Sequence, residues 1–102
     1  MRRIARSRTY IAQLKELLEH GNAVFGTAVV ERIHGRINHV IQDHLALFPS
    51  KPMDKKLGLY VFAVLHTPFV LVYDFDDKEL RIHFILPMRT DRRNIDPGAA
   101  EW

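Results

Sequence analysis

The sequence contains no cysteine, which excludes disulfide bonds, thiolate-ligated metals and cysteine redox chemistry. It also lacks a glycine-rich phosphate-binding loop, a Gly-x-Ser-x-Gly nucleophile motif and a pair of carboxylates arranged for acid–base catalysis. No internal repeat or low-complexity stretch is present. We therefore expect no cofactor, and the lack of cysteine suits a reducing cytoplasm.

Long hydrophobic runs are also scarce. Residues 57–73 are almost wholly apolar, but the run is barely long enough to cross a bilayer, and His66-Thr67-Pro68 interrupts it. Val, Phe and Tyr dominate it, which is typical of strands. No apolar segment of a secretory signal follows Met1. We expect neither a membrane span nor a secretory leader.

The histidines form no metal-binding pattern. His34, His39 and His44 recur every five residues, a spacing that rotates each by about 140° from the last on a helix. Zinc ligands on one helix face need a spacing of three or four residues. The sequence therefore predicts no metal site.

Length and charge limit the chain to one compact unit with an anionic partner. With 102 residues it has the size of a single domain. A net charge of +3 and a pI near 9.5 favour a partner that carries negative charge. The charge alone does not choose between a protein and a nucleic acid.

The first half of the chain is predicted to form a helical hairpin. Ser7 is the expected N-cap of a first helix, which the Gly21-Asn22 pair should stop. A second helix is predicted from about residue 23 to residue 47, before Pro49. Gly35 lies inside this helix at a cost of about 1 kcal/mol relative to alanine, so we expect the first helix to approach closely there.

The second half is predicted to form three antiparallel strands over residues 57–66, 69–75 and 79–86. Because side chains alternate along a strand, the third strand should have an apolar side facing the core and a basic side facing an anionic partner. The apolar side would hold Leu80, Ile82, Phe84, Leu86 and Met88, and the basic side Arg81, His83, Ile85 and Arg89.

These elements predict an α+β fold. The gaps between the strands are too short for crossover helices, and Asp74–Lys78 fits a hairpin turn. A brief strand at Arg3–Ala5 would add to one edge of the sheet. The expected architecture is a two-layer single domain over residues 1–102, with an N-terminal helical hairpin on a small antiparallel sheet in the order (β)ααβββ. For the tail, residues 94–102, packing of Trp102 on the domain, contact with a partner and disorder all stay open.

This order of elements, together with three sequence segments, resembles the RelE/ParE superfamily of bacterial toxins. The segments are Leu57-Gly-Leu-Tyr-Val61, Phe69-Val-Leu-Val-Tyr-Asp-Phe-Asp-Asp77 and Met88-Arg-Thr-Asp-Arg-Arg93. The resemblance implies the toxin of a type II toxin–antitoxin pair, of the plasmid-stabilisation type, that acts in the bacterial cytoplasm. A small antitoxin protein would neutralise it in a hetero-oligomer.

The superfamily contains two kinds of toxin, and the first would make this chain a ribosome-dependent mRNA endoribonuclease. For a RelE-like enzyme, the resemblance implies that Arg81, His83 and Arg89 are catalytic, with His66 as an alternative to His83. Lys51, Lys55 and Lys56 would supply the loop charges. Such chemistry needs cations to stabilise the phosphorane and a group to accept the 2′-OH proton. RelE-like members tend to carry an arginine shortly before the Val-Tyr pair, and residues 69–71 here are Phe-Val-Leu.

The second kind, ParE-like, resembles this chain in its apolar middle strand and in the basic stretch after the last strand. Such toxins are not enzymes but poison DNA gyrase. The resemblance then implies a target-binding group of Arg89, Arg92, Arg93, Lys55 and Lys56. It favours this ParE-like function, although the leading His-Gly of the family's basic stretch is missing. The endoribonuclease and a non-toxic basic binding module of the same fold remain alternatives.

Each of these residues also has a purely structural interpretation. Arg81 and His83 would be ordinary solvated residues on an exposed strand. Asp91 and Asp96 lie close enough in sequence to form ion pairs with the arginines around them, and exposed pairs of that kind contribute about 0.2–1 kcal/mol.

Overall fold

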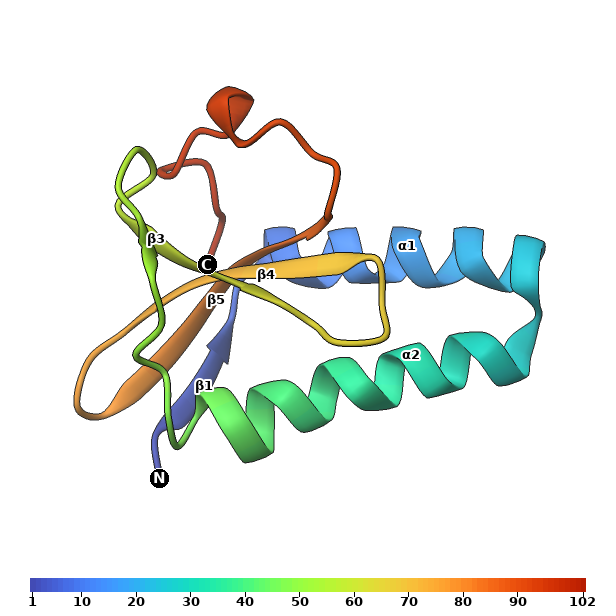
Figure 1. The fold of residues 1–102 in the computed structure, drawn as a ribbon, viewed down its shortest axis with the longest axis horizontal. Helices are drawn as coiled ribbons and strands as arrows, with labels where there is room; N and C mark the ends of the chain where they lie inside the picture. The colour runs from blue at the N-terminus through green and yellow to red at the C-terminus, as the bar shows by residue number, and fades with distance from the viewer.

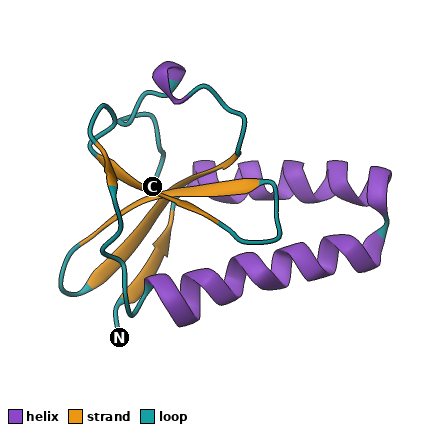
Figure 2. Cartoon of the chain, viewed as in Figure 1, coloured by secondary structure: helices purple, strands orange, loops and turns teal.

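A computed structural model describes residues 1–102 and has two helices packed on one face of a five-stranded sheet (Figures 1 and 2). The predicted α+β class and order of elements are confirmed. The strands are β1 (Arg3–Arg6), β2 (Met53–Asp54), β3 (Leu59–Ala63), β4 (Phe69–Phe75) and β5 (Glu79–Pro87). The helices are α1 (Arg8–Phe25) and α2 (Thr27–His39), which continues into a π-helical turn, Val40–Leu45. A 3₁₀ turn, Arg92–Asn94, follows the last strand.

The sheet has the strand order β1-β5-β4-β3-β2. β3, β4 and β5 are antiparallel neighbours, as predicted. The expected edge strand is present as β1, but it runs parallel to β5, so the sheet is mixed rather than antiparallel. This pairing is possible because the long connection through both helices brings the chain back in the same direction. β2 was not predicted, and the strand expected over residues 57–66 is shorter because the chain turns on both sides of β3.

The helix boundaries differ from the prediction at the glycines. α1 continues through Gly21 and ends at Gly26, whose φ of 86° suits glycine and few other residues. Gly21 is instead the point of close approach between the helices, because a Cβ there would lie 3.3 Å from Val30 Cγ2. Nothing lies within 4 Å of a Cβ built on Gly35, so the close approach expected at Gly35 was wrong.

The main core lies between the helices and the sheet. It contains aromatic and aliphatic side chains from both helical segments and from the two central strands, namely Tyr10, Ile37, Ile41, Leu45, Leu71, Tyr73, Leu80, Ile82 and Ile85. Tyr73 is fully buried, and its hydroxyl donates to the Pro49 carbonyl at 2.8 Å. This hydrogen bond fixes the end of the helical layer against the centre of the sheet.

β5 contains a β-bulge that changes which side chains face the core. Tyr73 pairs with Ile82 and Val72 pairs with Phe84, so His83 is an extra residue without a partner on β4. The predicted strict alternation is therefore wrong beyond His83. Ile85 turns towards the helices, while Phe84 and Leu86 pack on the opposite face.

The start of α1 forms hydrogen bonds with the backbone of β5 at the bulge. Ser7 N–H donates to the Ile82 carbonyl at 3.0 Å, and Ser7 Oγ donates to the His83 carbonyl at 2.6 Å. Gln13 Oε1 accepts a hydrogen bond from Ile85 N–H at 3.0 Å. Ser7 is also the N-cap of α1, as predicted, because its Oγ accepts from Tyr10 N–H at 2.8 Å.

The opposite face of the sheet is partly covered by the tail. A small apolar cluster of Leu57, Leu59, Val72 and Phe84 lies on this face, and Ile95 and Ala100 pack against it. In Figure 1 the tail leaves β5, loops outward and returns to the sheet. Of the three arrangements that the sequence left open for the tail, the structure has it packed on the domain.

Candidate anion-binding site

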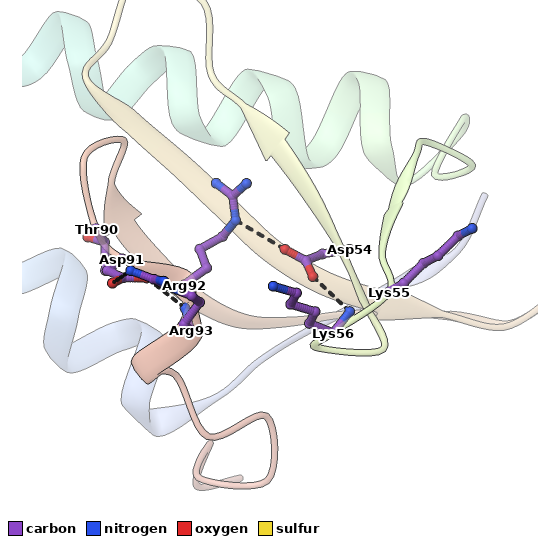
Figure 3. Close-up of a pocket in the computed structure, with 7 residues that line it drawn as sticks. All are labelled: Asp54, Lys55, Lys56, Thr90, Asp91, Arg92 and Arg93. Atoms are coloured by element: carbon purple, nitrogen blue, oxygen red, sulfur yellow. Dashed lines mark hydrogen bonds and ion pairs between the residues drawn. The ribbon is translucent and has the colours of Figure 1, made fainter.

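Two loops far apart in sequence form a polar cavity of about 570 Å³ (Figure 3). Asp54 is the last residue of β2, Lys55 and Lys56 lie in the turn that joins β2 to β3, and Thr90–Arg93 follow β5. No hydrophobic residue lines the cavity. Four of the five side chains predicted to bind a target, Lys55, Lys56, Arg92 and Arg93, are brought together here.

Asp54 holds the two loops together. Its Oδ1 accepts hydrogen bonds from the backbone N–H groups of Lys56 at 3.0 Å and Leu57 at 3.2 Å. Its Oδ2 lies 3.2 Å from Arg92 Nε, across the cavity. The N–H of Leu57, with help from the guanidinium of Arg92, lowers the pKa of the Asp54 carboxyl. Asp54 therefore stays ionised and keeps the lysine turn next to the arginine loop.

Asp91 organises the arginine loop. Its Oδ1 accepts from the backbone N–H of Arg93 at 3.0 Å, which caps the 3₁₀ turn. The Arg93 guanidinium donates to both carboxylate oxygens of Asp91, at 3.1 and 2.9 Å, and holds the pKa of that carboxyl below its usual value. The local ion pair expected at Asp91 is thus present. Asp96 instead accepts from the backbone N–H of Gly98.

The cavity has an excess of positive charge at neutral pH. Four of its lining side chains are cationic and two are anionic. The ion pairs of the cavity, Arg92–Asp54 and Arg93–Asp91, engage the arginines only, so Lys55 and Lys56 have no carboxylate partner within 4.0 Å. Figure 3 shows Lys56 pointing towards the arginine loop and Lys55 pointing away from it. Ammonium and guanidinium groups in this arrangement are suited to bind a phosphate or carboxylate.

The remaining predicted residues lie outside this cavity. Arg81 is surrounded by acids, with ion pairs to Asp74 at 2.8 Å, Asp76 at 2.9 Å and Glu79 at 3.3 Å. These bonds raise the pKa of Arg81, chiefly through Asp76. Arg89 is exposed beyond the end of β5 and makes no ion pair. The basic side expected on β5 is thus neutralised at Arg81.

His83, at the bulge, is covered rather than presented to solvent. Its side chain is 12% exposed, and Nε2 lies 3.2 Å from Asp74 Oδ1. The Trp102 ring stands edge-on to the imidazole, with 4.9 Å between the ring centroids. Neither Asp74 nor Trp102 was predicted as a neighbour of His83. The alternation of β4 and β5 could have indicated Asp74, but no sequence signal indicates the tryptophan.

Asp76 gives the β4–β5 hairpin a specific acid sensitivity. The Arg81 guanidinium and the backbone N–H groups of Lys78 and Glu79 lower its pKa from 3.8 to about 2. Because the folded-state pKa is depressed, this contribution to stability is present above the unfolded pKa and is lost as the pH falls from about 4 to about 2.

We expect Asp76→Asn to lower the free energy of unfolding at pH 5. Between pH 4 and pH 2, where the pKa values of Asp76 in the unfolded and folded states lie, the free energy of unfolding should fall less steeply in the variant than in the wild type. Urea titrations across this range measure the effect. Asp77→Asn is the matched control, because the Asp77 side chain makes no hydrogen bond or ion pair in the same turn. Equal slopes for wild type and Asp76→Asn would contradict the prediction.

Two classes of feature are absent from the structure. No group of three or more His, Asp or Glu side chains is placed to hold a metal ion. No helix combines the length and the hydropathy that a membrane span requires.

The chain was compared with known proteins by sequence and by structure. No protein-family model matches the sequence, and no curated protein matches it. A solved structure does match. It is a chain of the "Chromosomal ParDE TA system from P. aeruginosa", with a TM-score of 0.69 and 18% sequence identity, over 85% of this chain and 96% of that one. The two chains share a fold. At the level of fold, this agrees with the resemblance drawn from the sequence.

Proposed function

We propose that this chain is the toxin of a bacterial type II toxin–antitoxin system, of the ParE-like kind. Its fold is shared with a chain of a ParDE toxin–antitoxin system, and its sequence resembles the same superfamily. In this proposal a small antitoxin protein neutralises it in the cytoplasm. The toxin acts by binding DNA gyrase and trapping the complex with cleaved DNA, without catalysis of its own.

The observation that carries the proposal is that Lys55, Lys56, Arg92 and Arg93 line one exposed polar cavity. A poison needs a rigid surface that complements its target and needs no reactive group. Asp54 and Asp91 supply the rigidity because each fixes an arginine, and the lysines supply charge that no acid neutralises. An anionic surface of the gyrase–DNA complex fits this cavity by charge.

The same geometry weighs against the RelE-like endoribonuclease. A general base must reach the proton that it abstracts, and a cation must be free to meet the phosphorane. Arg81 is bound to three carboxylates, and His83 lies beneath Trp102 while the tail is packed on the sheet. Arg89 is exposed and makes no ion pair, and it does not line the cavity. The ribonuclease therefore ranks second, and a non-toxic basic binding module third.

The experiment is a pulse of labelled thymidine and labelled methionine, given minutes after this chain is induced without a partner in bacteria. We expect thymidine incorporation to fall first, because a trapped gyrase complex blocks replication. A culture that carries the empty vector is the control. An earlier fall in methionine incorporation would favour the ribonuclease. If neither falls and growth continues, the chain is not an active toxin.

A further inference from the structure

The tail is attached to the start of α1 by three polar contacts. The backbone N–H of Arg8 donates to the Glu101 carbonyl at 2.6 Å, and Glu101 N–H donates to Thr9 Oγ1 at 2.9 Å. Arg8 Nε donates to the main-chain oxygen of Trp102 at 3.0 Å. These contacts bring Trp102 across the second face of the sheet and over the bulge in β5.

The residue beneath the tryptophan is an imidazole without hydrogen bonds. Both ring nitrogens of His83 are buried and lack a hydrogen-bond partner. Asp74 Oδ1 is 3.2 Å from Nε2, close enough for an ion pair but without the alignment of a hydrogen bond. Burying polar nitrogens in this way is unfavourable. The closed tail therefore keeps both ring nitrogens of His83 from the hydrogen bonds that they would form with water.

The tail itself is held weakly. Of residues 95–102 only Ile95 and Ala100 are partly buried, and Trp102 is 46% exposed. In the middle of β4, by contrast, Leu71, Val72 and Tyr73 are fully buried. Segments with few buried apolar contacts open at a small fraction of the global free energy of unfolding.

We propose that residues 95–102 are a strap that opens while the rest of the domain stays folded, and that controls access to His83 and Asp74. With the strap closed, both ring nitrogens of His83 are shielded from water and from any ligand. With the strap open, the His83–Asp74 pair lies on an accessible sheet face, free to form hydrogen bonds. The strap does not depend on the anion-binding cavity being a target site, so either proposal can fail without the other.

The first test is hydrogen exchange of the intact chain of 102 residues, made by cell-free synthesis so that growth inhibition does not limit its yield. We expect the amides of Arg8 and Glu101 to exchange at least about 100-fold faster than the amide of Leu71, because local opening needs less free energy than global unfolding. Equal protection at the three amides would show that the strap opens only when the protein unfolds, and would overturn the proposal.

The second test follows acylation of each histidine by diethyl pyrocarbonate, with the modified peptides resolved by mass spectrometry. In the wild type we expect His83 to react about tenfold more slowly than the exposed His20, and we expect Trp102→Ala to remove most of that protection. Trp102→Phe keeps a ring over His83 and should preserve the protection.

Thr9→Val gives a second, independent release of the strap, because it removes the hydroxyl that accepts from Glu101 N–H and keeps the shape of the side chain. It should raise the rate at His83 and leave the rate at His20 unchanged. His83 that reacts as fast as His20 in the wild type would overturn the proposal. Slow acylation of His83 that persists in both Trp102→Ala and Thr9→Val would also overturn the proposal, provided that both variants have the circular dichroism of the wild type.

Discussion

The double variant Lys55→Glu/Lys56→Glu should no longer inhibit growth when it is induced without a partner. The two lysines are the cations of the cavity that no carboxylate neutralises, so reversing them turns its excess positive charge into an excess of negative charge. Like charges brought together at an interface cost several kcal/mol. Affinity for an anionic target should therefore fall by about 100-fold or more. Colony counts after induction, and binding to gyrase with and without DNA, measure the loss.

The control for this variant is Lys15→Glu/Lys78→Glu, which changes the net charge by the same amount at two exposed positions outside the cavity. It should inhibit growth as the wild type does. If both double variants lose activity equally, the overall charge matters and the cavity does not. If Lys55→Glu/Lys56→Glu is as toxic as the wild type, the cavity is not the target site.

Ser7→Ala should cause one of the largest losses of stability that a single small substitution can cause in this chain. Ser7 is fully buried, and its hydroxyl makes two hydrogen bonds, one to the first turn of α1 and one to the bulge in β5. Losing an N-cap costs about 1 kcal/mol. The His83 carbonyl, left without its donor, costs about 1–3 kcal/mol more. We expect the free energy of unfolding to fall by about 2–4 kcal/mol in total. This is a large share of the roughly 5–15 kcal/mol that is usual for a folded protein.

Urea unfolding of Ser7→Ala measures this loss, and Ser50→Ala is the matched control because Ser50 is exposed. The control should stay within about 0.5 kcal/mol of the wild type, as exposed substitutions usually do. A loss below that value in Ser7→Ala would mean that water replaces the hydroxyl, and that the bulge does not depend on the start of α1.

The sequence allowed accurate prediction where the pattern was local. β4 has the predicted bounds, Phe69–Phe75, because an apolar β-branched run between a proline and an acidic turn has few other structures open to it. The N-cap at Ser7 was also predicted correctly, because it depends only on Ser7 and the helical turn that follows it. The end of α1 was not, because Gly21 alone does not show whether it stops a helix or lets a second helix approach.

The bulge could not be read from β5, because an extra residue exists only relative to the partner strand. One signal was present. Phe84, Ile85 and Leu86 are three apolar residues in succession, which strict alternation with one polar face does not explain. The run fits a strand that is buried on both faces, here by the helices and by the tail.

The candidate site was predicted in its residues but not in its geometry. The basic types at positions 55, 56, 92 and 93 indicated anion binding, yet nothing in the sequence placed the two loops together. One long-range ion pair, Arg92 with Asp54, joins them. Conversely, Arg81 looked available on its strand, and only the hairpin turn shows that three acids surround it.

The parallel pairing of β1 with β5 also sets the order in which the protein can be completed during its synthesis. Arg3 pairs with Glu79, so the first strand has no partner until the chain has grown by about 76 residues. At translation rates of about 5–20 residues per second, this takes on the order of 4–15 s. Until β5 is made, the apolar side of the helical hairpin lacks the strand that supplies Leu80, Ile82 and Ile85 to the core. Contacts so distant in sequence slow folding, and the nascent chain is most exposed to chaperones, proteases or a binding partner before its last strand emerges.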